Sequence, residues 1–342
     1  MTASLAWVAW LLASLALLLA TRNPLLILLI LVLLLGLGMT LSAPQERKRW
    51  LGQNLRFIGT MIFLSGLINF IFTHTGQSTL FALPSHWFLI GGSFTLESLV
   101  YGAINGLMIS SLYLTFTILN KALSVQQLTR LIPNAFYPLT LITTISLTFF
   151  PSIQERTRQI KEAQMIRGNP MEKLTDWLPI LIPLMVTSLE NAIRLSESMT
   201  ARGFQANAGR QDSSRGLIVL ILATFLVFAG WILSLFNYPT WISWSLYLIA
   251  LLAIVLLLSA QSRQVRITHL HQDRWTRLDI FATALFALGF LVMLSLIVFQ
   301  KTDFLAYSPY PALTFPTLPP AAWLLAWVPG LPILLRPHDH RN

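Results

Sequence analysis

The sequence predicts an all-α protein, a polytopic membrane helical bundle with long cytoplasmic helices. Hydrophobic residues make up 55% of the 342 positions and charged residues only 11%, whereas about a quarter of a soluble domain is charged. The mean hydropathy is +0.67. Apolar runs long enough to cross a bilayer recur along the chain and flank one long polar, helix-forming segment, Pro151 to Phe204.

Seven apolar runs have roughly the length of a membrane-spanning helix. They cover residues 5–20, 25–42, 55–73, 97–119, 217–235, 241–260 and 279–299. The first run is expected to stay in the protein, because no basic segment precedes it and no small-residue cleavage pattern follows it. Cysteine is absent, which excludes disulfides and thiolate metal sites.

The remaining segments have other patterns. Residues 121–138 alternate apolar and polar positions at helical spacing, which predicts an amphipathic helix at the membrane surface. Residues 139–150 are apolar but too short to span, and residues 73–93 suit an outer loop. The chain therefore divides into four predicted regions: N-terminal transmembrane helices in 1–120, amphipathic and cytoplasmic helices in 121–215, C-terminal transmembrane helices in 216–300, and a Pro-rich tail of open placement in 301–342.

Basic residues predict the orientation. If residues 139–150 do not cross, the basic clusters at 47–56, 121–130, 156–215 and 263–277 all lie on one side of the membrane. Arg22 and Lys301 then lie on the other side, and Arg336 and Arg341 are left unassigned. Because lysine and arginine accumulate in cytoplasmic loops, the polar segment and the N-terminus are predicted to be cytoplasmic. The net charge of +10 thus indicates membrane topology rather than nucleic-acid binding.

Two helices of the polar segment are predicted to end in the same way. The sequence is Glu-Ala-Gln-Met-Ile-Arg-Gly over residues 162–168 and Glu-Ser-Met-Thr-Ala-Arg-Gly over residues 197–203. One such ending is ordinary, since arginine complements the helix dipole and glycine closes the helix. Two endings on one side of a membrane indicate a paired protein-docking device, because the planar fork of arginine can bind oxygens in a partner groove.

Flanking residues are expected to shape these two helices. Asn169 and Pro170 are predicted to cap and begin the second helix. Pro151 and Pro183 are predicted to mark a cap or kink, and the second helix is expected to be kinked or restarted near Pro183. Supporting roles beside the arginines are expected for Glu162, Ala163, Glu197 and Ser198.

This segment resembles the coupling helices of the transmembrane T component of energy-coupling factor (ECF) transporters, the EcfT/CbiQ family. Ala201-Arg202-Gly203 matches the Ala-Arg-Gly signature of that family, and Ile166-Arg167-Gly168 matches it except at Ile166. Similarity covers residues 20–260 and is densest between 130 and 205.

The resemblance implies a non-catalytic subunit of an ATP-driven importer in the cell membrane. Its docking residues would be Ile166, Arg167 and Gly168 on one helix and Ala201, Arg202 and Gly203 on the other, with one motif for each of two ABC-type ATPases. ATP and Mg²⁺ would bind to those partners, and this chain would bind no cofactor. A membrane-embedded S component would capture the vitamin or transition-metal ion.

The alternative function is a membrane-embedded enzyme acting on a lipid or isoprenoid substrate. Such an enzyme needs clustered aspartates or a histidine base, whereas Asp176 and Asp212 are isolated. A self-contained permease would need polar groups within its spans, which here are almost purely aliphatic. No phosphate-binding loop occurs, and the histidine pairs at 269/271 and 338/340 point to different faces of a helix, so no metal site is expected.

Overall fold

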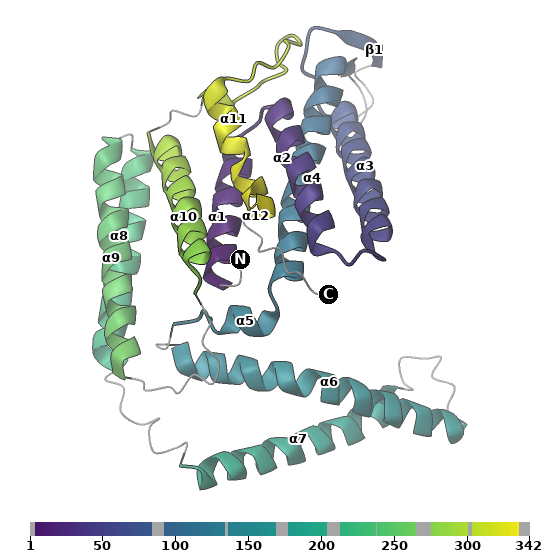
Figure 1. Ribbon diagram of the computed structural model, residues 1–342, viewed down its shortest axis with the longest axis vertical. Helices are drawn as coiled ribbons and strands as arrows, with labels where there is room; N and C mark the ends of the chain where they lie inside the picture. Colours follow the sequence, from purple (N-terminus) through teal and green to yellow (C-terminus); the bar gives the residue numbers. More distant parts are fainter. Residues whose placement is uncertain are drawn as a thin grey trace. The chain divides into compact units, whose positions relative to one another are not determined.

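The computed structural model describes residues 4–83, 92–133, 136–168, 177–203, 213–236, 238–264, 275–299 and 303–334. Within these residues, seven helices are long and apolar enough to cross a membrane. Six of them match predicted spans, and the seventh is Leu178–Ala201, which lies in the segment predicted to be cytoplasmic. The predicted span at 5–20 forms the shorter apolar helix Ser4–Ala20. The all-α, polytopic membrane fold is therefore confirmed (Figure 1). The chain forms two compact units, Met1–Leu128 with Leu270–Asn342, and Thr129–His269.

Five long helices build the first unit. They are α1 (Ser4–Ala20), α2 (Pro24–Leu41), α3 (Arg47–Phe72), α4 (Leu96–Ala122) and α10 (Arg277–Val298). Helix α1 contacts both α4 and α10, and α2 packs against α4. Helices α1, α2, α4 and α10 contribute fully buried apolar side chains to the core: Trp10, Leu17, Ile30, Leu114 and Phe286. The turn before α2 is fixed locally, because Asn23 Oδ1 accepts a hydrogen bond from the Leu25 amide at 3.1 Å and Pro24 begins the helix.

Helices α3 and α4 approach each other at two glycines of α4. A Cβ atom on Gly102 would lie 2.5 Å from the Ser65 carbonyl oxygen, and one on Gly106 would lie 2.7 Å from Cα of Ile62. Any side chain at these positions would therefore collide with the backbone of α3. The contact is of the small-residue kind that allows membrane helices to pack closely.

The predicted outer loop at residues 73–93 contains a two-stranded antiparallel hairpin, β1 (Thr79–Leu83) and β2 (Gly92–Thr95). Glu97, in the first turn of α4, is completely buried, and its Oε1 accepts a hydrogen bond from the Ser78 amide at 2.9 Å. Thr95 Oγ1 donates to the Thr75 carbonyl oxygen at 2.7 Å. These contacts hold the turn before the hairpin onto the start of α4.

The second unit contains α6 (Tyr137–Ile166), α7 (Leu178–Ala201), α8 (Ser213–Leu235) and α9 (Thr240–Gln264). Helices α8 and α9 pack on each other and agree with the predicted spans at 217–235 and 241–260. Their contact is close at Gly230, where a Cβ atom would lie 2.8 Å from the Tyr247 ring.

The structure contradicts two predictions for residues 121–150. The single amphipathic helix expected at 121–138 is absent, because α4 continues to Ala122 and the short helix α5 (Val125–Thr129) starts anew. Ser124 and Gln127 form a reciprocal cap there: the Ser124 amide donates to Gln127 Oε1 at 2.9 Å, and the Gln127 amide donates to Ser124 Oγ at 3.3 Å. The separate segment expected at 139–150 is the first half of α6, which runs through to Ile166.

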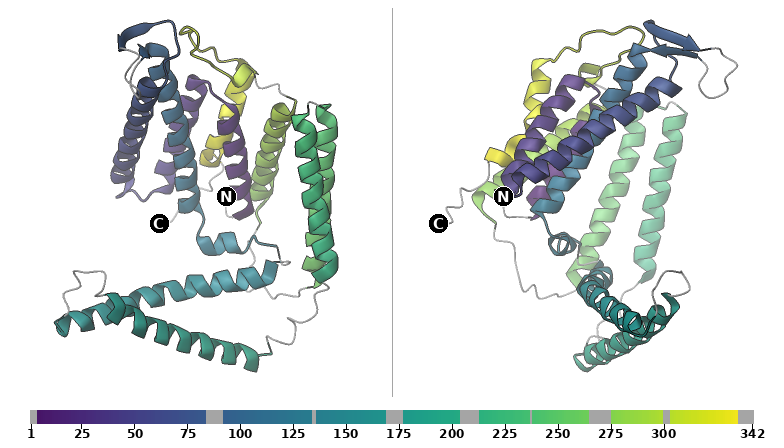
Figure 2. Two further views of the ribbon diagram at one scale, coloured as in Figure 1. Left: turned by 180° about the vertical axis from the view of Figure 1, so that it is seen from behind. Right: turned by 90° about the vertical axis from the view of Figure 1, so that its right-hand side faces the viewer.

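The C-terminal part of the chain packs on the first unit. It consists of η4 (Asp303–Leu305), α11 (Pro320–Ala326), η5 (Val328–Gly330) and α12 (Leu331–Leu334). The elements α11, η5 and α12 contact α2, and Figures 1 and 2 show α11 and α12 beside α1 and α2. The sequence had left the placement of this tail open.

Candidate partner-docking site

The first candidate docking tip is the end of α6. Arg167 follows the last helical residue, and its amide donates to the carbonyl oxygens of Ala163 at 3.3 Å and Gln164 at 3.1 Å. Gly168 adopts the left-handed conformation, with φ of +84°, and its amide donates to the Met165 carbonyl oxygen at 3.0 Å. The neighbouring Ile166 side chain is 88% exposed, so the tip is open on its apolar side as well as at the arginine.

The second tip, at the end of α7, has the same construction. The Arg202 amide donates to the carbonyl oxygens of Ser198 at 3.3 Å and Met199 at 3.2 Å. Gly203 has φ of +76°, and its amide donates to the Thr200 carbonyl oxygen at 2.9 Å. Ala201, Arg202 and Gly203 are all exposed.

The two glycines are required by backbone conformation rather than by space. A Cβ atom on Gly168 or Gly203 would meet no atom within 4 Å. Left-handed backbone is nevertheless unfavourable for residues with a side chain. Each glycine therefore ends its helix sharply.

The supporting residues have defined places. Ala163 and Ser198 supply the equivalent carbonyl oxygens that bind the arginine amides, and Ser198 Oγ also donates to the Leu195 carbonyl oxygen at 2.8 Å. Glu162 lies 3.5 Å from Arg158 in an ion pair, so its charged partner in the structure is Arg158 rather than Arg167. Glu197 is exposed on α7. Direct support of the two tip arginines by these glutamates stays a prediction.

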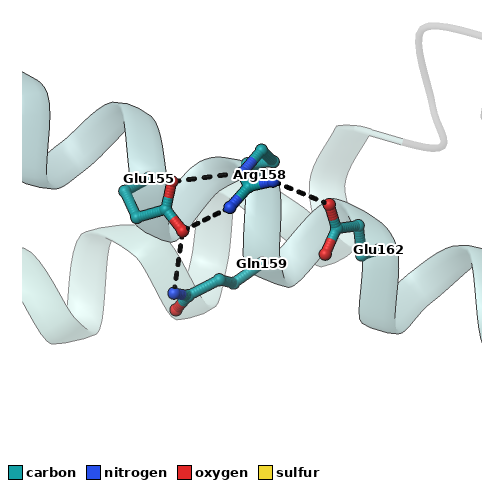
Figure 3. Close-up of polar contacts among 4 residues, drawn as sticks. All are labelled: Glu155, Arg158, Gln159 and Glu162. Carbon is teal, nitrogen blue, oxygen red and sulfur yellow. Dashed lines mark hydrogen bonds and ion pairs between the residues drawn. The ribbon is translucent and has the colours of Figure 1, made fainter.

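An ion-pair network on α6 was not predicted from the sequence (Figure 3). Arg158 contacts Glu155 at 2.7 Å and Glu162 at 3.5 Å, and Gln159 Nε2 donates to Glu155 Oε1 at 3.1 Å. The hydrogen bonds from Arg158 and Gln159 hold the pKa of Glu155 below its ordinary value. The spacing of three and four residues between these side chains was a usable signal. The network reinforces the polar half of α6 that carries the first tip.

The prolines do not interrupt the two helices. Pro151 lies inside α6 and Pro183 inside α7, so a cap at Pro151 and a helix restart at Pro183 are both wrong. A kink at either proline stays a prediction. One missing amide donor in each helix does not end it, because neighbouring residues continue the hydrogen-bonding pattern. Helix α7 instead begins at Leu178, with Pro179 in its first turn. Asn169 and Pro170 lie outside the described residues.

Helices α6 and α7 contact each other. Figure 1 shows them crossing, with their C-terminal ends pointing away from each other. The two tips therefore lie at opposite ends of the helix pair.

A broad apolar surface covers the first two thirds of α7. Its members are at least half exposed: Leu178, Leu181, Ile182, Met185, Val186, Leu189 and Ile193. Hydroxyl groups on α7 add little polarity to it, since Thr187 Oγ1 and Ser188 Oγ donate to the Leu184 carbonyl oxygen of their own helix. By length and composition α7 also qualifies as a membrane-spanning helix. This surface suits lipid or an apolar membrane partner.

The fold thus defines a multi-pass, all-helical membrane protein whose crossed helices end in two matching arginine-glycine tips. The sequence pattern of the cobalt transport protein family CbiQ matches residues 2–214, a region that includes both tips. The chain belongs to this family, which includes the transmembrane T components of ECF transporters, and it is a transporter component of the cell membrane.

Individual relatives agree with this assignment. The chain is 29% identical over 205 residues to the energy-coupling factor transporter transmembrane protein EcfT of Acidaminococcus fermentans, covering 52% of this chain and 74% of that protein. It is 28% identical over 236 residues to EcfT of Bacillus selenitireducens, covering 64% of this chain and 86% of that protein. It is also 28% identical over 183 residues to EcfT of Macrococcus caseolyticus, covering 44% of this chain and 68% of that protein.

Proposed function

We propose that the chain docks two ABC-type ATPase subunits through its two tips and transmits their ATP-driven movement to a membrane-embedded S component. Uptake of a vitamin or a transition-metal ion would follow, with the S component selecting the substrate. ATP and Mg²⁺ are bound by the ATPases in this account, and the chain itself is not an enzyme. The observation that carries the proposal is the equivalent geometry of the Arg167 and Arg202 tips.

The chemistry of the tips supports docking. Each arginine stands at an exposed helix end, where its five N–H donors can bind carboxylate or carbonyl oxygens in a groove. A hydrogen bond to a charged group contributes about 1.5–3 kcal/mol, which corresponds to about 10- to 100-fold in affinity. Two such contacts at opposite ends of a crossed helix pair suit two separate ATPase subunits.

The apolar surface of α7 supports transmission. A movement of an ATPase at a tip acts on a continuous helix, because α7 passes Pro183 without a break. The exposed apolar side chains lie on the same helix as the Arg202 tip. In this account the S component rests on that surface and is displaced when the helix moves.

Co-purification tests the proposal. The double variant Arg167→Glu/Arg202→Glu is co-expressed with its ATPases and isolated from membranes through a tag on this chain. We expect loss of at least about 100-fold in ATPase affinity, since two charged contacts are reversed. Arg194→Glu is the matched control, because Arg194 is an exposed arginine of α7 away from the tip. Retention of both ATPases by the double variant, with transport intact, would refute docking through these tips.

A further inference from the structure

Residues 303–334, the C-terminal segment, lie beyond the region matched by the family pattern, which ends at residue 214. They belong to the first unit, whereas both tips belong to the second. They bury Leu305, Ala322 and Ala326 almost completely. The segment is thus part of the core of the first unit, and its role is separate from that of the tips.

Residues 305 and 317 of the segment, the first at the end of η4, hold the turn between α1 and α2. The Leu305 carbonyl oxygen accepts hydrogen bonds from Thr21 Oγ1 at 3.2 Å and from the Arg22 amide at 3.0 Å. Asn23 Nδ2 donates to the Thr317 carbonyl oxygen at 2.8 Å. Three consecutive residues of the turn are therefore bound by backbone carbonyls of the segment.

The helical part packs along the sides of α1 and α2. Its helix is interrupted at η5, where the Pro329 carbonyl oxygen accepts a hydrogen bond from the buried Trp10 Nε1 at 2.9 Å. A Cβ atom on Gly330 would lie 3.3 Å from Cβ of Leu33. Interrupted backbone at membrane depth is tolerated only where protein covers it and satisfies its polar groups. Residues 320–334 therefore depend on α1 and α2 for their stability within the membrane.

We infer that the C-terminal segment is an internal clamp, which occupies one face of the α1–α2 hairpin permanently and fixes the hairpin within the first unit. Four hydrogen bonds and the burial of its small side chains hold it in place. The covered face is closed to lipid and to any membrane partner. The clamp stays docked while the transporter works.

A disulfide tests the docking directly, because the natural chain contains no cysteine. In Leu33→Cys/Gly330→Cys the Cβ atoms would stand about 3.3 Å apart, slightly below the usual range of about 3.5–4.5 Å in disulfides, so a small shift of the segment suffices to form the bond. We expect most of the full-length chain in membranes to form this bond on mild oxidation. The control pair Leu28→Cys/Gly330→Cys uses an α2 residue that is 50% exposed and should remain reduced. Absence of the first bond, or equal bonding in both pairs, would overturn the clamp.

The same variant distinguishes a permanent clamp from a moving lid. We expect the oxidised Leu33→Cys/Gly330→Cys protein, in complex with its partners, to transport at the rate of its reduced form. Transport that stops on oxidation and returns on reduction would show that the segment must move, and would contradict a permanently docked clamp. Only this comparison relies on the proposed function.

Truncation measures what the clamp contributes to stability. Removal of residues 303–342 should lower the Tm of the detergent-solubilised chain by at least about 5 °C, since more than one stabilising contact is lost. Leu324→Ala, at a position of the segment that is 78% exposed, is the control and should leave the Tm nearly unchanged. Trp10→Phe keeps the aromatic ring but removes the donor to Pro329, and should lower the Tm by a smaller amount. A chain without residues 303–342 that has the same Tm as the full-length chain would contradict the clamp.

Discussion

Arg167 and Arg202 occupy equivalent positions at the ends of two different helices. Their backbone angles are φ −79°, ψ 4° and φ −87°, ψ 7°, and each is followed by a glycine in the left-handed conformation. The amide of each arginine binds the carbonyl oxygens three and four residues earlier. The backbone geometry of the two tips is therefore closely similar, although Ile166 precedes one arginine and Ala201 the other.

Alanine at the two tip glycines should weaken both the tips and ATPase binding. Left-handed backbone costs a residue with a side chain roughly 1–2 kcal/mol, which corresponds to about 5- to 30-fold at each tip. We expect Gly168→Ala and Gly203→Ala each to reduce ATPase affinity within this range, measured by titration of the purified chain with its ATPases.

The control is Gly52→Ala in α3, where a Cβ atom also meets nothing within 4 Å. An alanine inside a helix should be neutral or slightly stabilising. If Gly168→Ala and Gly203→Ala behave like Gly52→Ala, the left-handed glycines have no part in docking.

The network around Arg158 should make the polar half of α6 sensitive to acid. The pKa of Glu155 is lowered by hydrogen bonds from Arg158 and Gln159, so its stabilising effect is present above the pKa of the unfolded chain. This effect is lost as the pH falls through the lowered pKa of the folded state. Hydrogen exchange at residues 155–162 should therefore become faster, relative to the intrinsic rate, as the pH falls below about 4.5.

Glu155→Gln removes the titrating group and should abolish this pH dependence. Because the residues are exposed, the effect should be small and should diminish at high salt. If Glu155→Gln shows the same pH dependence of hydrogen exchange, a group other than Glu155 is responsible for it.

The contact between α3 and α4 should be intolerant of any side chain at Gly106. A Cβ atom there would lie 2.7 Å from Cα of Ile62, and overpacking of this kind costs about 1–3 kcal/mol. We expect Gly106→Ala to lower the Tm by several degrees, whereas Gly59→Ala, on the open side of α3, should not. Equal Tm values for the two variants would show that α3 and α4 can separate without cost.

The tips could be predicted from the sequence because helix endings are set by local chemistry. Glycine after arginine at Gly168 and Gly203 determines a left-handed cap whatever lies around it. Six of the seven candidate spanning helices in the described residues were also predictable, since long apolar runs leave few alternatives. The extent of α6 was not predictable in this way. Pro151 was expected to separate two segments, but the helix continues through it.

Other features depend on contacts between distant parts of the sequence. Nothing near Pro329 indicates that its carbonyl oxygen binds Trp10, more than three hundred residues earlier. The burial of Glu97 likewise depends on the turn at Ser78, which precedes it by 19 residues. A composition rich in proline therefore suggested an unplaced tail, where the structure has a packed segment that covers α1 and α2.

Thiol protection distinguishes tips that dock an ATPase from tips that stay free in the complex. Ile166→Cys and Ala201→Cys each place one cysteine at a tip of a chain that otherwise has none, and Gln154→Cys places one on an exposed position of α6 away from the tip. In the isolated chain all three should react quickly with a water-soluble maleimide. In the complex with its ATPases, we predict that Cys at 166 and at 201 becomes protected while Cys at 154 still reacts. Tip cysteines that react equally fast with and without the ATPases would contradict docking through Arg167 and Arg202.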